Sequence, residues 1–89
     1  MPLVLIPPPY RGPTQGTAEL EVEGENVLAC LEAVEQAFPG IMPLMVDGNG
    51  GLHRFVKLFR NGDLLVGDVL QTRVDPTDEI EILAAIAGG

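Results

Sequence analysis

The chain has 89 residues, of which 46% are hydrophobic, so it suffices for one small cored domain and is too short for two. Five basic against thirteen acidic residues leave a net charge of -8, which argues against binding to nucleic acid or to an anionic membrane surface. No apolar run approaches the roughly 20 residues of a membrane span, and Met1 to Pro9 lacks the basic start of a signal peptide. The single cysteine, Cys30, cannot form an internal disulfide, so we expect a soluble protein of the cytoplasm.

The first part of the chain predicts two paired strands. Leu3–Ile6 is an aliphatic run that stops at three prolines, which cannot donate hydrogen bonds to a sheet. After a turn-rich segment, apolar and acidic residues alternate up to Glu23, with Ala18, Leu20 and Val22 expected to face inward. The two segments together indicate an antiparallel hairpin.

A helix is expected next. Asn26 is a suitable N-cap, and Pro39-Gly40 would stop the helix. The residues that share its apolar face are Val27, Leu31, Val34 and Phe38. Cys30 lies on the flank of this face, and we interpret it as a small buried hydrophobe rather than a reactive thiol.

The second half of the chain predicts a loop at residues 41–51 and then three strands. Within the first of these strands, Val56 and Leu58 share one face, and the residues that alternate with them share the other. Asn61-Gly62 is a strong signal for a tight hairpin. The last strand follows a turn and should bury Ile80 and Ile82. The three expected strands are Phe55–Arg60, Leu64–Val66 and Glu79–Leu83.

The order strand, strand, helix, strand, short strand, strand predicts an α+β fold of the β-grasp (ubiquitin-like) class. In this fold a mixed sheet of four to five strands wraps over one helix. Another α+β roll with the same elements is the alternative. We expect residues 1–89 to form a single domain with a flexible C-terminal tail at residues 84–89.

Signatures of a catalytic centre are absent from the sequence. The sole histidine, His53, stands beside Arg54 at the start of a strand, and we expect it to have a structural or surface role. The glutamates of the alternating segments are expected to be exposed charge without a part in acid–base chemistry. The sequence therefore predicts a protein that is not an enzyme and that binds neither metal nor cofactor itself.

The unusual feature of the sequence is its end. Residues 84–89 have no charged or polar side chain and finish with Gly88 and Gly89, a composition that suits insertion into a narrow channel. The reactive group at such a tip is the α-carboxylate of Gly89, which is ionised at neutral pH. Adenylation by ATP would turn this carboxylate into an acyl adenylate that a sulfur or nitrogen nucleophile can attack.

The predicted strand order, the strand Glu79–Leu83 and the tail Ala84-Ala-Ile-Ala-Gly-Gly89 resemble the ThiS/MoaD family of ubiquitin-like sulfur carriers. The resemblance covers nearly the whole chain. Within the family, Gly51-Leu-His-Arg-Phe-Val56 followed by Asn61 is most similar to the carriers of the thiocarboxylate-dependent pathway of cysteine synthesis, and Leu52-His-Arg-Phe55 is the best indicator of this branch. Ala84 departs from the pattern, because relatives usually have proline there.

The resemblance implies that an E1-like adenylyltransferase/sulfurtransferase activates Gly89 with ATP and converts it to a thiocarboxylate. In the cysteine branch, a pyridoxal-phosphate cysteine synthase accepts the sulfur on an aminoacrylate intermediate. A zinc peptidase then removes the added cysteine and restores Gly88-Gly89. The protein would be a cosubstrate, and its partners would hold the ATP and the cofactors.

Relatives face their activating enzyme with apolar residues that correspond here to Leu64 and Leu83. We expect Phe59, Ile86 and Arg54 to add to this partner-binding surface, the alternative being that Phe59 and Leu64 are ordinary core residues. Other functions are left open. They are the small subunit of molybdopterin synthase, docked on its large subunit; a ubiquitin-like protein modifier; and a binding domain with an incidental Gly-Gly end.

Partners are expected to recognise the globular surface, because the tail offers almost no side-chain information. This surface combines net acidity with a predicted basic cluster of Arg54, Lys57 and Arg60. An acidic carrier that meets a basic-rimmed active-site entrance on its sulfur acceptor would gain encounter rate, and salt would reduce this gain.

Overall fold

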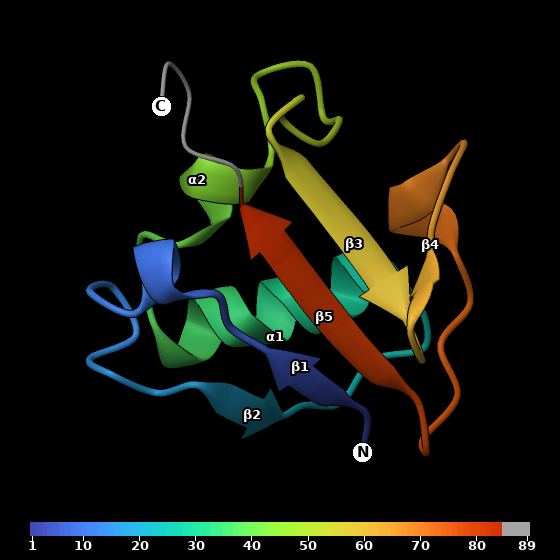
Figure 1. The fold of residues 1–89 in the computed structure, drawn as a ribbon, viewed down its shortest axis with the longest axis horizontal. Coiled ribbons are helices and arrows are strands. Elements are labelled where there is room, and N and C mark those ends of the chain that lie inside the picture. Colours follow the sequence, from blue (N-terminus) through green and yellow to red (C-terminus); the bar gives the residue numbers. More distant parts are fainter. Residues whose placement is uncertain (85–89) are drawn as a thin grey trace.

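The computed structural model describes residues 1–84, which form a five-stranded mixed sheet with a helix across one face (Figure 1). The strands are β1 (Leu3–Leu5), β2 (Glu19–Glu21), β3 (Val56–Arg60), β4 (Asp63–Leu64) and β5 (Glu79–Ala84). Their order in the sheet is β2-β1-β5-β3-β4. β1 and β5 are parallel, and the other neighbouring strands are antiparallel. This arrangement confirms the predicted β-grasp fold.

The helix α1 (Val27–Ala37) begins where the sequence predicts it. The side chain of Asn26 accepts a hydrogen bond from the backbone N–H of Ala29 at 2.8 Å and so satisfies one of the free donors of the first turn. Phe38, at the end of the predicted apolar face, is the C-cap and is half-buried. Cys30 is buried, and burial raises the pKa of its thiol, as expected for a structural residue.

The connection after α1 contains a helix that the sequence pattern did not predict. Gly40, two residues after the C-cap Phe38, has φ +105°, a conformation that glycine adopts without strain. The short helix α2 (Met42–Met45) follows inside the segment 41–51 that was expected to be a loop. The Glu35 carboxylate accepts hydrogen bonds from the N–H groups of Met42 and Gly40, at 2.8 and 2.9 Å, and both lower its pKa. Four residues held by a side chain of the preceding helix are too few to give a periodic signal.

The hairpin between β3 and β4 has the predicted turn but a different second strand. Asn61 and Gly62 have φ values of 52° and 88°, as a two-residue turn that matches the twist of the strands requires. This turn places Asp63 directly opposite Arg60. The second strand therefore begins one residue earlier than the predicted Leu64–Val66 and ends at its first residue.

The first hairpin is confirmed, with β1 antiparallel to β2. Its inward pattern is only partly right, because Val22 is buried and Leu20 is half-buried, whereas Ala18 is exposed. β2 lies at the edge of the sheet (Figure 1) and has three residues, so Ala18 precedes the strand. Two 3-10 turns, at Pro8–Tyr10 and Val69–Gln71, were not predicted.

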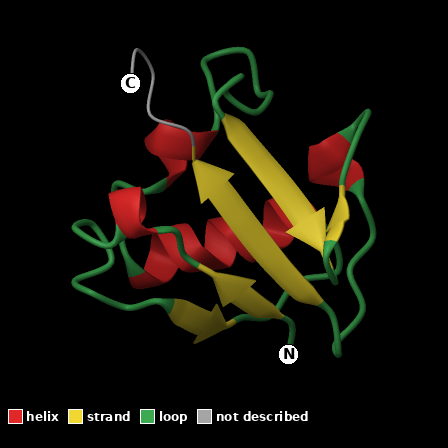
Figure 2. Ribbon diagram, in the orientation of Figure 1, coloured by secondary structure: helices red, strands yellow, loops and turns green. Residues whose placement is uncertain are grey.

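One hydrophobic core lies between the sheet and α1. In Figure 2, α1 crosses behind the sheet, and β3 and β5 face the viewer with no helix in front of them. The strands bury the residues that alternate toward the helix, including Val4, Val56, Leu58, Ile80 and Ile82. Within residues 1–84, no helix has the length and apolar character needed to cross a membrane.

Candidate functional site

β5 leads the chain through the middle of the sheet toward the predicted reactive end. It lies between β1 and β3, and its last residue, Ala84, pairs with Val56 at the start of β3. Ala84 was expected in the tail and belongs instead to the sheet, because β3 extends far enough to pair with it. The predicted adenylation site at Gly88 and Gly89, and the predicted contact residue Ile86, lie outside the described residues. What the structure defines is the surface around the end of β5.

Three of the predicted partner-binding residues share the outer face of the sheet. Phe59 pairs with Leu64 across the β3–β4 hairpin, and Leu83 pairs with Lys57 across β3 and β5. Leu64 and Leu83 are each 50% exposed, and Phe59 is half-buried, whereas Leu58 on the opposite face is 1% exposed. Leu64 is therefore not a core residue. We call Phe59, Leu64 and Leu83 the outer apolar patch.

A cation–π pair adjoins the end of β5. The guanidinium carbon of Arg54 lies 4.8 Å from the centroid of the Phe55 ring, and Phe55 is 37% exposed. Phe55 directly precedes Val56, the partner of Ala84, so the pair lies beside the point where β5 ends. Phe55 was not predicted to bind a partner. Phe55 alternates with the buried Val56 and therefore lies on the same outer face as Lys57. This alternation is the sequence signal that could have identified Phe55 as exposed.

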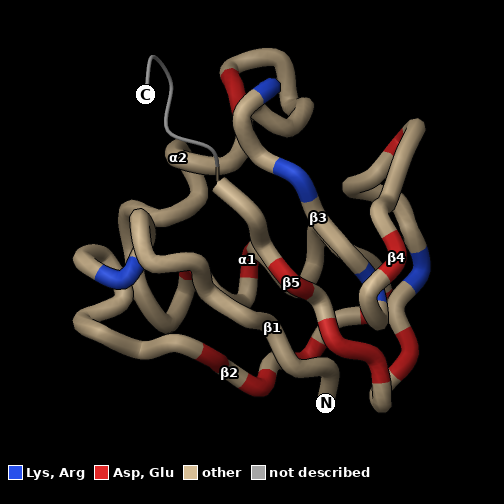
Figure 3. The backbone as a smooth tube through the Cα atoms, viewed as in Figure 1, with Lys and Arg blue, Asp and Glu red and all other residues tan. Residues whose placement is uncertain are grey.

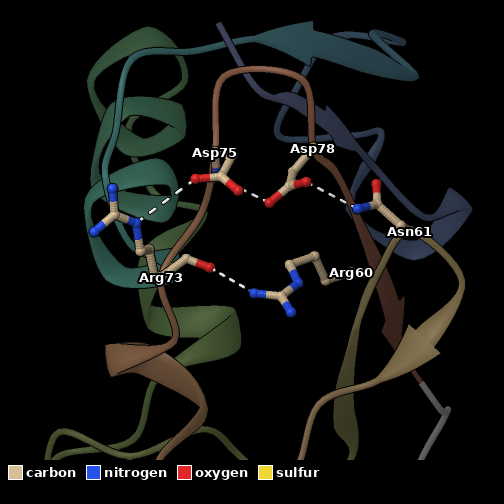
Figure 4. A network of polar contacts seen from close by, with 5 residues as sticks. All are labelled: Arg60, Asn61, Arg73, Asp75 and Asp78. Carbon is tan, nitrogen blue, oxygen red and sulfur yellow. Dashed lines mark hydrogen bonds and ion pairs between the residues drawn. The ribbon is translucent and has the colours of Figure 1, made fainter.

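The predicted basic cluster does not form. Arg54 and Lys57 lie at or just before the start of β3, whereas Arg60 lies at its other end. There Arg60 donates a hydrogen bond from Nη1 to the carbonyl oxygen of Arg73 at 2.8 Å (Figure 4). The prediction was wrong for Arg60 because an extended strand separates residues that are close in sequence.

Among residues 1–84, no group of three or more histidine, cysteine, aspartate or glutamate residues could hold a metal ion. Nε2 of His53 lies 3.2 Å from the carbonyl oxygen of Pro43, which fits the expected structural role. The glutamates of β2 and β5 are exposed, and the one ion pair found in this part of the chain joins Arg73 to Asp75 at 3.6 Å.

A cleft of about 310 Å³ lies where β1 ends, next to the last residues of β5. β1 pairs only with residues 79–81, so residues 82–84 extend past it. Pro7 and Pro8 end β1, and Nε of Arg11 donates to the carbonyl oxygen of Ile6 at 3.2 Å. A larger cavity of about 550 Å³ lies at the opposite end of β5, between residues 24–26 and 71–76. The sequence did not predict either cavity, because both depend on how distant segments pack.

The fold and this surface define a ubiquitin-like carrier, in which a β-grasp sheet presents an apolar face beside its last strand. The chain belongs to the ThiS family, whose family model matches residues 5–89. It is a small sulfur carrier of the ThiS/MoaD type and not itself a catalyst, as the sequence predicted.

Solved structures agree with this assignment over the whole chain. A chain in the crystal structure of the Amycolatopsis orientalis BexX/CysO complex is 32% identical, with a TM-score of 0.91 and 100% of both chains covered. Mycobacterium tuberculosis CysO is 28% identical, with a TM-score of 0.89 and 97% of this chain and 100% of that chain covered. Small archaeal modifier protein 1 from Methanosarcina acetivorans is 25% identical, with a TM-score of 0.82 and 99% and 95% covered. No curated protein sequence gave a significant match.

Proposed function

We propose that the chain carries sulfur for cysteine biosynthesis as a C-terminal thiocarboxylate on Gly89. The observation that supports this most is the similarity to CysO structures over the full length of the chain. The sequence Leu52-His-Arg-Phe55, which resembles the cysteine branch, lies next to the end of β5 and supports the same choice.

The first half of the proposed cycle is activation by an E1-like enzyme. A carboxylate oxygen of Gly89 attacks the α-phosphate of ATP, and pyrophosphate leaves. A sulfur nucleophile then displaces AMP from the acyl adenylate and leaves the thiocarboxylate. The outer apolar patch would bind the enzyme while the end of the chain enters its active site, because Leu83 is the neighbour of the last described residue.

The second half is sulfur transfer. The thiocarboxylate sulfur would add to the β-carbon of an aminoacrylate held on a pyridoxal-phosphate cysteine synthase, which forms a C–S bond and leaves Gly89 joined to cysteine as a thioester. The freed cysteine amine would then displace the sulfur from the Gly89 carbonyl, so that a peptide bond replaces the thioester and the thiol is released. A zinc peptidase would then release cysteine and restore Gly88-Gly89. We place the cycle in the cytoplasm, where ATP is available and the free thiol of Cys30 stays reduced.

A second candidate function is protein modification through Gly89. It is favoured by the similarity to small archaeal modifier protein 1. Chemically it differs only in the nucleophile, since a lysine amine instead of sulfur would displace AMP from the same adenylate. A third, use as the small subunit of molybdopterin synthase, would send the same thiocarboxylate to a different acceptor.

The test uses intact mass spectrometry. The purified chain is incubated with an E1-like adenylyltransferase, ATP and sulfide, and we expect the mass increase of one oxygen replaced by sulfur. Deletion of Gly89 should abolish this change without unfolding the domain. The thiocarboxylate form is then given to a cysteine synthase with an activated serine, and a cysteine residue should be added to Gly89. Conversion of a molybdopterin precursor with a large subunit, and no transfer to any synthase, would refute the cysteine assignment.

A further inference from the structure

Among residues 1–84, two of the five basic residues differ from the rest because no carbonyl or carboxylate oxygen holds them. The other three are held by the fold: Arg11 by the carbonyl oxygen of Ile6, Arg60 by the carbonyl oxygen of Arg73, and Arg73 by the carboxylate of Asp75. Within the part of the chain that the structure describes, Arg54 and Lys57 have neither an ion pair nor a side-chain hydrogen bond. Both residues are exposed. The fold therefore leaves two cations available to a partner.

These two cations lie beside the end of β5, on the side of β3. Lys57 pairs with Leu83 on the outer face, and Arg54 stacks on Phe55, which adjoins the partner of Ala84. The apolar side chains beside the charges are accessible, since Leu83 is 50% exposed and Phe55 is 37% exposed. The result is an apolar surface with positive charge at its margin, in a chain whose net charge is -8.

The acidic residues lie mostly elsewhere. Figure 3 shows basic residues near the start of β3, and acidic residues along β2 and toward the start of β5. Within residues 1–84, neither cation forms an ion pair with an acid. Asp47 already accepts hydrogen bonds from the N–H groups of Asn49 and Gly51, at 2.8 and 3.2 Å. Glu81, diagonal to Lys57 across β3 and β5, is not within ion-pair distance of it.

We propose that Arg54 and Lys57, with Phe55 and Leu83 beside them, dock an acidic segment of the activating enzyme at the rim of the channel that receives the tail. This proposal rests on the proposed function, because it concerns the enzyme that adenylates Gly89. The two cations of the carrier meet the acidic segment of the enzyme only when the end of β5 faces that rim. A carrier turned so that β2 faces the enzyme would bring the glutamates of β2 against the acidic segment and be repelled. The two cations thus orient an acidic carrier for insertion of its tail.

The test compares two double variants that change the net charge by the same amount. Arg54→Gln/Lys57→Gln removes two positive charges beside the end of β5. Gln36→Glu/Gln71→Glu adds two negative charges at exposed positions, one on α1 and one in the 3-10 turn Val69–Gln71. Affinity for the purified E1-like adenylyltransferase is measured without ATP at low and high salt, and kcat/KM for thiocarboxylate formation is measured in parallel. Thermal unfolding of each variant establishes that it is folded.

We expect the Arg54→Gln/Lys57→Gln variant to lose about tenfold in affinity and in kcat/KM and to show a weaker salt dependence than the wild type. The matched control should change both by less than about twofold, and Arg54→Lys/Lys57→Arg should retain wild-type binding. The proposal would be overturned if Arg54→Gln/Lys57→Gln and Gln36→Glu/Gln71→Glu lost the same affinity. Tighter binding by Arg54→Gln/Lys57→Gln would overturn it as well. Charge-dependent binding without thiocarboxylate formation would contradict the proposed function alone, and absence of wild-type binding would contradict both.

Discussion

Asn61 donates a hydrogen bond from its side-chain amide to the carboxylate of Asp78 at 2.8 Å, which joins the β3–β4 turn to the start of β5. The side-chain oxygen of Asn61 also accepts the backbone N–H of Glu79 at 2.9 Å. The other carboxylate oxygen of Asp78 accepts the N–H of Asp75 at 2.8 Å (Figure 4). One network therefore joins the β3–β4 turn, the turn before β5 and the start of β5. The network fixes where β5 enters the sheet and therefore where it leaves it.

Replacement of Asn61 tests this network. Asn61→Ala removes both side-chain hydrogen bonds and places alanine at φ 52°, so we expect it to lower the free energy of unfolding by about 2 kcal/mol. Asn61→Gly removes the same bonds without the backbone strain and should cost about 1 kcal/mol. Urea unfolding of the three proteins measures both values. Equal stability of the alanine and glycine variants would show that the positive φ contributes nothing.

Acid should destabilise the fold through three carboxylates that accept backbone hydrogen bonds. Their pKa values are lowered, chiefly by the N–H of Met42 at Glu35, of Asn49 at Asp47 and of Asp75 at Asp78. A carboxylate with a lowered pKa in the folded state contributes its full stabilisation above its ordinary pKa of about 4. That contribution is lost as pH falls through the lowered value, because the unfolded chain then binds more protons.

The expected result is a melting temperature that falls between pH 5 and pH 2, measured by circular dichroism. Glu35→Gln cannot titrate and should be less stable than the wild type at pH 7, with a flatter decline in acid. A Glu35→Gln curve parallel to the wild-type curve throughout this range would contradict the role given to Glu35.

The predictable parts of the fold are those that short segments encode. Asn26 caps α1, Asn61-Gly62 forms the turn, and Ile80 and Ile82 are buried as their alternation indicates. Each depends on the backbone preference of one residue or on a period of a few residues. Leu64 and Leu83 were selected through the family resemblance, and alternation along the strands is compatible with their exposure.

The unpredicted parts depend on contacts between distant segments. The carboxylate of Glu35 on α1 holds the start of α2, and the hydrogen bond from Asn61 to Asp78 joins two turns that are far apart in the sequence. Arg60 is close to Lys57 in the sequence. In the structure, however, Arg60 bonds the carbonyl oxygen of Arg73, and the path of the chain before β5 determines where that oxygen lies. No local pattern encodes such a pairing.

Gly24 is expected to resist substitution because of its closeness to α1. A Cβ at this position would lie 2.8 Å from both the backbone nitrogen and the Sγ of Cys30. We expect Gly24→Ala to lower the free energy of unfolding by about 1–3 kcal/mol. Because the backbone nitrogen cannot move aside, Gly24→Ala should still destabilise a Cys30→Ala background. A double-mutant cycle by urea unfolding measures this, and full recovery in that background would assign the clash to the sulfur atom alone.

The outer apolar patch should contribute to binding more than to stability. Leu64→Ala and Leu83→Ala each remove a side chain that is half exposed, so each should lower the free energy of unfolding by less than about 1 kcal/mol. Leu58→Ala, on the buried face of β3, should cost about 2–5 kcal/mol. Against the activating enzyme, the two exposed leucines should each lose about 1–2 kcal/mol of binding, as anchors of an interface do.

Calorimetric affinity and thermal unfolding, measured on the same preparations, separate these two effects. A patch that only covers the sheet would show the reverse order, with binding unchanged and stability reduced. If Leu64→Ala lowers the melting temperature and leaves the affinity intact, the docking role of Leu64 is wrong. If Leu83→Ala alone weakens binding, the interface is confined to the end of β5, because Leu64 lies on β4 at the far edge of the sheet and Leu83 lies beside the last described residue.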